Sequence, residues 1–184
     1  MGKTLDNFEK TIKELDDFNL PEYKELPDIA LYMEQVVGYI KECLEQFSNK
    51  DDSIITPFMV NNYVKHKIIS PPTNKKYSES HIMYLIVIGI LKSVLNISEI
   101  GMVIKMQIEQ YPIQVAFDFF AIELENSLKV TFGTRDFAEA NSEKEKTPLS
   151  KLVRSALLSF ANKVYVKKNI YLDYQEYQEK LKAL

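Results

Sequence analysis

The sequence has few of the residues that break helices or cross-link a fold. It contains five glycines and seven prolines among 184 residues, and an all-β protein needs more turn-forming positions than these supply. The single cysteine, Cys43, excludes a disulfide within the chain and is typical of a reducing cytosol. The N-terminal sequence lacks the basic start and following apolar run of a signal peptide, so we expect none. The most apolar stretch, His81 to Leu95, is interrupted by Lys92 and is too short to span a bilayer. We therefore expect a cytoplasmic protein with no membrane segment.

The motifs of common catalytic and cofactor sites are missing as well. There is no Cys-x-x-Cys, no His-Glu-x-x-His and no glycine-rich phosphate loop. The spacing of His66, His81 and Cys43 matches no common zinc pattern, and no pair of carboxylates stands out as an acid and a base. These absences favour a protein that is not an enzyme and that uses no cofactor or metal.

Helical periodicity is present in nearly every segment. With 46% hydrophobic residues the chain can bury a substantial core, and apolar residues recur at steps of three and four from residue 5 onward. We predict an all-α fold with at most one small β-ribbon, near Ser70 to Tyr77. Three parts are expected: N-terminal helices over 1–52, a central helical unit over 53–110 and C-terminal helices over 111–184.

Several helix boundaries can be predicted from local chemistry. Pro27 suits the first turn of a second helix, and Thr56-Pro57 places a hydroxyl cap before a proline. Ser78 is expected to begin a longer helix that is apolar on more than one face and therefore buried at the centre. Gly89 in its middle indicates close approach by another element. Asn96 has capping-box spacing to Glu99.

A basic segment lies in the middle of this acidic chain. Residues 56–78 contain four lysines and no Asp or Glu, whereas the net charge of the whole chain is −3. The remainder therefore carries −3 − 4 = −7. Such a local concentration of positive charge indicates a surface that faces an anion, and a nucleic-acid backbone is the commonest large one. A sequence pI of about 5.5 means that contact with DNA should be local.

The same segment resembles the winged helix-turn-helix of the MerR class of transcription regulators. The residues that match are Val60, Asn62, Tyr63, Ile68, Ile69, Pro71, Lys75 and Tyr77, followed by Ser98-Glu99-Ile100. The chain also resembles a bacterial family of uncharacterised proteins that carries a MerR-like segment. The motifs of that resemblance are Leu31 to Val36, Asn61 to Lys65 and Lys75 to Ser78.

The resemblance implies a DNA-binding regulator that contacts double-stranded DNA through a MerR-like winged helix-turn-helix over residues 53–110. It implies that helix 56–67 enters the major groove and that loop 70–77 forms a short wing. Asn61 and Asn62 are the candidates for reading bases, because asparagine can form two hydrogen bonds with adenine. The candidates for phosphate contact are Lys65, Lys67, Lys75, Lys76 and Tyr77. Only the helix that ends near Phe47 stands where the first helix of such a reader is expected.

The C-terminal region from Thr147 to Leu184 has a wide apolar stripe followed by spaced tyrosines. Tyrosine offers a large contact area with a polar end, so we expect this region to form a homodimer. A helix that folds back on its own domain fits the same pattern. The alternative function is a non-catalytic module that binds a protein or a small ligand and keeps the winged fold without DNA binding.

Overall fold

The computed structural model describes residues 2–48, 53–136 and 147–182, and these are mostly helical. The predicted all-α class is confirmed. The α-helices are α1 (Gly2–Asp16), α2 (Met33–Cys43), α3 (Pro57–Lys65), α4 (Glu79–Leu91), α5 (Ile97–Gln110), α6 (Ile113–Thr131) and α8 (Pro148–Lys182). Short 3-10 turns follow at η1 (Tyr23–Glu25) and η2 (Glu45–Phe47), and the strands are β1 (Leu31–Tyr32) and β2 (Lys76–Tyr77). Among the described residues no helix combines the length and apolarity that crossing a membrane requires.

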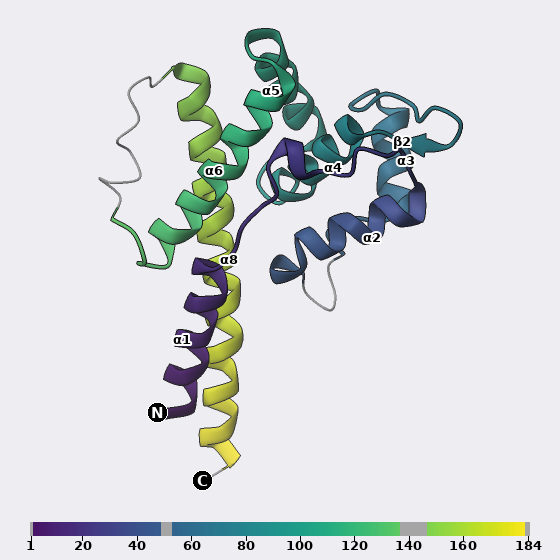
Figure 1. The fold of residues 1–184 in the computed structure, drawn as a ribbon. Coiled ribbons are helices and arrows are strands. Elements are labelled where there is room, and N and C mark those ends of the chain that lie inside the picture. Colours follow the sequence, from purple (N-terminus) through teal and green to yellow (C-terminus); the bar gives the residue numbers. More distant parts are fainter. Residues whose placement is uncertain (1, 49–52, 137–146, 183–184) are drawn as a thin grey trace.

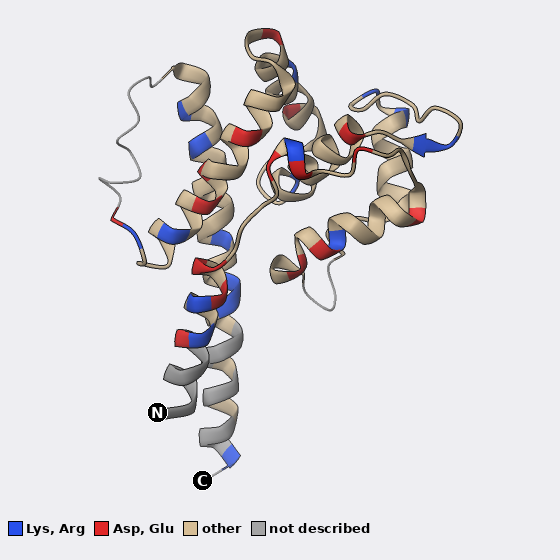
Figure 2. Ribbon diagram, viewed as in Figure 1, with Lys and Arg blue, Asp and Glu red and all other residues tan. Residues whose placement is uncertain are grey.

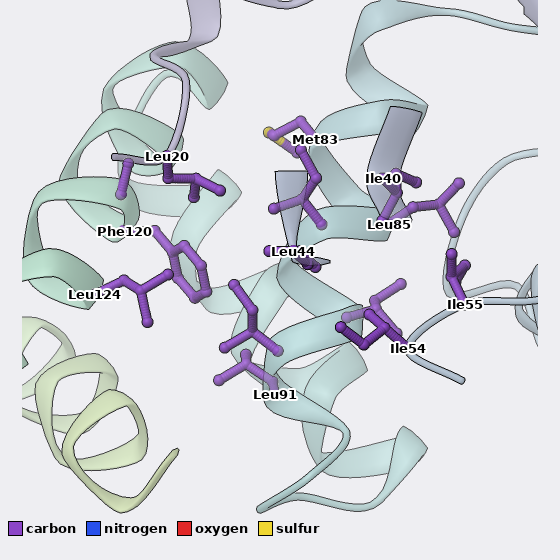
Figure 3. Packing of buried hydrophobic residues seen from close by; sticks show 14 of the residues in the cluster. Leu20, Ile40, Leu44, Ile54, Ile55, Met83, Leu85, Leu91, Phe120 and Leu124 are labelled. Atoms are coloured by element: carbon purple, nitrogen blue, oxygen red, sulfur yellow. The ribbon is translucent and has the colours of Figure 1, made fainter. Parts of the chain in front are cut away.

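Helix α4 lies at the centre of the fold (Figure 1). Its sequence is apolar on every side, so it must be covered from several directions. α2, α6, α8 and β2 all contact it, and Ile82, Leu85, Ile86 and Ile88 have no exposed surface. Figure 3 shows core side chains from several elements converging on this helix. Buried residues from all three predicted segments form one hydrophobic cluster.

Gly89 lets two side chains approach α4 closely. A Cβ atom at this position would lie 3.2 Å from Ile54 Cγ2 and 3.2 Å from Leu44 Cδ1. The expected close approach is therefore present, and the approaching groups are the end of α2 and the segment that leads into α3.

A buried ion pair joins α6 to α8, which form the most extensive helix contact in the molecule. Arg154 donates from Nε to Glu123 Oε2 (2.7 Å) and from Nη2 to Glu123 Oε1 (2.8 Å). Only 3% of Glu123 and 8% of Arg154 are exposed. Such a bidentate ion pair fixes the rotation of one helix against the other. Neither residue stands out in the sequence.

Helices α1 and α8 contact each other and extend together from the rest of the molecule (Figure 1). The chain between α1 and β1 crosses α6, where side-chain oxygens satisfy its main-chain N–H groups. Tyr23 N–H donates to Asp118 (2.7 Å), and Leu20 N–H donates to Glu125 (3.2 Å). Burial raises the pKa of Glu125, more than the bond from Leu20 lowers it.

The prediction that Pro27 begins the second helix is wrong. Leu31 pairs with Tyr77 and Tyr32 with Lys76 in an antiparallel ribbon, so residues 31–32 are extended and α2 begins at Met33. Gln35 Oε1 accepts the Tyr32 N–H at 2.9 Å, which satisfies one donor at the helix start. Ile29, which would lie in the first turn of a helix that began at Pro27, is 67% exposed. The predicted ribbon thus exists, but its second strand comes from residues 31–32.

Removing one partner of the buried pair should destabilise the protein strongly. Glu123→Ala leaves a buried guanidinium without its carboxylate, and we expect the free energy of unfolding to fall by about 3–5 kcal/mol. Replacing both Glu123 and Arg154 with leucine should restore much of that stability. Urea denaturation measures each value.

The control is Glu109→Ala, which breaks the exposed pair with Lys105 and should cost less than about 1 kcal/mol. Equal decreases in stability for Glu109→Ala and Glu123→Ala would contradict this role of the α6–α8 pair.

Candidate nucleic-acid interface

Helix α3 begins and ends with hydrogen bonds that its sequence explains. The Thr56 hydroxyl accepts the Met59 N–H at 3.2 Å, and Pro57 occupies the first turn, as predicted. At the other end Ile68 N–H donates to the Tyr63 carbonyl (3.0 Å) and Lys67 N–H to the Val64 carbonyl (3.0 Å). This is the Schellman arrangement, in which the residue at the Lys67 position adopts a left-handed conformation.

The two faces of α3 differ sharply. Val60 is fully buried and Tyr63 is 6% exposed, so these side chains hold the helix on the core. Asn61 and Lys65 are exposed on the opposite face, and Asn62 is partly exposed. Phe58 shares that face at a spacing of three and seven residues, and it is 81% exposed. The outer face therefore presents one aromatic ring, two amides and one ammonium group.

Lys67 adopts a conformation that lysine disfavours. Its φ is 58°, which brings Cβ close to the carbonyl oxygen and costs roughly 1–2 kcal/mol for residues other than glycine. Glycine is the usual residue at this position of a Schellman motif. The sequence nevertheless places a charged, exposed side chain here.

Lys75, in the tight turn before β2, also adopts a left-handed backbone conformation. Lys76 N–H donates to the Thr73 carbonyl (2.9 Å) and Thr73 N–H donates to the Lys76 carbonyl (3.1 Å). Asn74 and Lys75, between them, have φ values of 51° and 62°. This is a two-residue turn of type I′, for which Asn-Gly is the preferred pair. Lys75 stands where glycine would be favoured and is exposed.

The side chains of Lys76 and Tyr77 point to opposite faces of strand β2. Lys76 points toward β1, and its Nζ lies 5.0 Å from the centre of the Tyr32 ring, a distance at which the ring attracts the cation. The side chain of Tyr77 faces inward and is 3% exposed. Its ring packs edge to face on His81, with centres 5.5 Å apart. Tyr77 is thus part of the core and anchors the strand, and its burial leaves it poorly placed for the phosphate contact expected from the sequence.

His81 fastens both ends of the loop between α3 and α4. Its Nδ1 accepts the Ser78 N–H (3.1 Å), which leaves the proton on Nε2 to be donated to the Ser70 carbonyl (3.1 Å). The imidazole is 7% exposed. Ile69, beside Ser70, is 3% exposed. The lysines of the loop therefore extend from a backbone that is attached to the core.

The four lysines of the basic segment lie on α3, just after it, and at β2. Lys65 lies on α3, Lys67 follows it, and Lys75 and Lys76 lie at the turn and on β2. Figure 2 shows this positive charge along β2 and the loop before it. β1 pairs with β2, and α2 contacts both α3 and β2, so the elements that carry these lysines all lie around α2.

Sequence reasoning missed two residues in this region, Phe58 and Tyr32. The sequence pattern could have identified Phe58, because a phenylalanine here interrupts the otherwise polar outer face of the helix. The position of Tyr32 beside Lys76 depends on the pairing of β1 with β2, which no local pattern indicates.

Comparison with protein families identifies a match over residues 21–120, more than half of the 184-residue chain, to the domain of unknown function DUF1836. The chain belongs to this family. The prediction of an uncharacterised family is confirmed in that respect. Comparison with curated proteins finds no match, and comparison with solved structures finds none either. DUF1836 covers the whole interface, from η1 through β1, α2, α3 and β2 to the first part of α6.

Replacing a lysine whose backbone is in the left-handed region with glycine should stabilise this DUF1836 protein. Lys67→Gly and Lys75→Gly each relieve a positive-φ conformation, and we expect the free energy of unfolding to rise by up to about 1 kcal/mol per site. Lys65→Gly removes the same charge from a helical position and should lower it by about 0.5–1 kcal/mol.

Urea denaturation of the three variants distinguishes the two effects. A decrease in stability for Lys67→Gly and Lys75→Gly equal to that for Lys65→Gly would show that backbone conformation does not decide the outcome.

Proposed function

We propose that this DUF1836 protein binds double-stranded DNA as a transcription regulator, through α3 and the basic turn before β2. The observation that carries the proposal is the pair of lysines, Lys67 and Lys75, at positions where glycine would be more stable. Backbone strain of this kind concentrates at functional sites. Because Lys67 and Lys75 lower the stability of the fold, we infer that they are present for another reason. Each supplies an exposed positive charge, which adds to the two amides and one ammonium group on the outer face of α3.

The order of the elements supports a winged helix-turn-helix of the MerR type. β1, α2, α3, β2 and α4 follow one another, β1 pairs with β2, and α2 packs on α3. In this arrangement α2 is the first helix, α3 is the reading helix, and residues 70–77 are a short wing. The major groove, about 12 Å wide, admits one α-helix.

The outer face of α3 supplies the base contacts in this proposal. Asn61 and Asn62 offer an amide oxygen and an amide N–H₂ each, which match the N6 and N7 edge of adenine. Phe58 adds an apolar surface of the kind that contacts the methyl group of thymine. Its 81% exposure is costly in water, and contact with a base edge would relieve that cost.

The four lysines supply phosphate contacts on either side of the helix. Lys65 and Lys67 lie at its end, and Lys75 and Lys76 lie on the wing. Contact with phosphates fixes the position of a reader on the duplex but carries no sequence information.

A glycine variant tests the phosphate contacts without destabilising the fold. The double change Lys67→Gly and Lys75→Gly should weaken binding to all duplexes alike. It should also reduce the slope of log affinity against log salt by about 0.9 for each phosphate that the variant no longer neutralises. Fluorescence anisotropy over a salt series, on a preferred site selected from random duplexes and on a scrambled duplex, measures both effects.

The matched control for charge is the pair Lys105→Gln and Lys129→Gln, on α5 and α6, which removes two positive charges outside the proposed interface. It should leave affinity and slope unchanged. Asn61→Ala should cost about 1–3 kcal/mol on the preferred site and little on the scrambled duplex. This interface would be excluded if the affinity of the wild type did not depend on salt concentration, or if the glycine variant bound with the affinity of the wild type.

A second copy of the chain is part of the proposal, because one short helix contacts few base pairs. The projecting part of α8 carries exposed apolar side chains at helical spacing. They are Val166 (53% exposed), Ile170 (58%), Tyr174 (58%) and Tyr177 (57%). α1 also contacts α8, and we propose that the exposed stripe packs on its equivalent in another copy.

Ile170→Glu should therefore convert a dimer into a monomer, because it places a charge in the centre of the stripe. Light scattering across a concentration series measures the mass. The control is Val115→Glu, at a 54%-exposed valine of α6 outside the stripe, which should leave the dimer intact. A wild-type monomer at every concentration would contradict the dimer.

A further inference from the structure

A cavity lies between the end of α4 and the middle of α8, away from the proposed DNA interface. Its volume is about 170 Å³. Eight uncharged residues form its wall, and three lysines line it as well. The uncharged residues are Leu44, Phe47, Ile54, Gly89, Ile90, Ser93, Phe160 and Val164.

The inner wall is aromatic and aliphatic. Phe47 and Phe160 pack edge to face with ring centres 5.1 Å apart, and Leu44 has no exposed surface. Figure 3 shows Leu44 and Ile54 among the core side chains around α4. Gly89 lets Ile54 and Leu44 pack directly on the backbone of α4, because a Cβ atom there would lie 3.2 Å from each of them. Such a wall suits an apolar group.

The lysines that line the cavity are Lys92, Lys163 and Lys167, and none of the described lining residues is acidic. Lys163 Nζ donates to the Ser93 carbonyl (2.8 Å), and Lys92 Nζ donates to the Ser53 carbonyl (3.0 Å). An ammonium group has three donors, so a neutral carbonyl does not exhaust the capacity of Lys163. A carboxylate forms shorter and stronger hydrogen bonds with ammonium groups than a neutral carbonyl does.

We propose that this cavity binds a small organic carboxylate with an apolar body, of about the size of benzoate. The apolar body would pack on Phe47, Phe160 and Val164, and the carboxylate would accept a hydrogen bond from Lys163 and attract the ammonium group of Lys92. The volume suits such a ligand, because an apolar cavity of about 150 Å³ holds benzene in another protein. A second cavity, between α4, α5 and α6, has a volume of only about 40 Å³ and is too small for such a body.

The site is linked to α3 through Lys92. Besides donating to Ser53, its ammonium group lies 3.9 Å from Met59 Sδ on α3. A carboxylate that draws Lys92 toward the cavity changes its bond to Ser53, three residues before the Thr56 cap. Occupation of the cavity should therefore alter the surroundings of Met59. This inference is independent of DNA binding, since both its parts are measured on the protein alone.

Isothermal titration calorimetry with the full chain tests the site. Benzoate should bind at one site per chain, whereas benzyl alcohol, which has the ring without the charge, and acetate, which has the charge without the ring, should each bind at least about tenfold more weakly. Lys163→Gln should weaken benzoate binding by about tenfold or more. Lys151→Gln, on an exposed lysine of the same helix, should bind like the wild type.

Equal affinity for benzoate and benzyl alcohol would overturn the proposal, because the lysines would then play no part. An unchanged affinity in Lys163→Gln, or no heat with millimolar benzoate, would overturn it too.

Methyl NMR tests the link to α3. The signal of Met59 should shift with the same midpoint as benzoate binding, whereas that of Met102, which is 61% exposed on α5, should stay in place. A Met59 signal that does not move while calorimetry shows binding would remove the link. Failure of the protein to bind DNA would change neither measurement.

Discussion

The burial of α4 on all sides is the constraint on which the rest of the structure depends. A helix that is apolar all round cannot lie on a surface, so α2, α6, α8 and β2 must all pack against it. Each end of α4 then positions one of the two proposed binding regions. At its start, His81 fastens Ser70 and Ser78 and so fixes the basic loop. At its end, Gly89, Lys92 and Ser93 line the cavity with α8.

The energetic cost of the proposed interface is local and can be named. Lys67 and Lys75 hold left-handed conformations, and Phe58 is largely exposed on α3. Each of these lowers the stability of the isolated protein, while the core beneath them is fully packed by Val60, Tyr77 and Ile69. A rigid base with destabilising residues on its outer side is typical of a surface selected for binding.

The sequence predicted those features that depend on neighbours along the chain. The Thr56 cap, the Asn96–Glu99 capping box and the burial of α4 follow from local chemistry and periodicity, and all are present. The start of α2 was predicted wrongly because residues 31–32 pair with 76–77, a contact between distant segments. The Glu123–Arg154 pair and the cavity at Lys163 likewise join separate helices. Their residues show no unusual spacing, so only the packed structure brings them together.

The exposure of the basic turn and of the outer face of α3 supports one central claim, that this surface binds DNA. The most direct measurement is a titration of isotope-labelled protein with its preferred duplex, followed by the amide signals of each residue. We predict that the signals of Asn61, Lys67 and Lys75 change together, while those of Lys105 and Glu109 on α5 stay in place. Changes centred on α5 or on the cavity at Lys163, with unchanged signals from α3 and the turn, would contradict this claim.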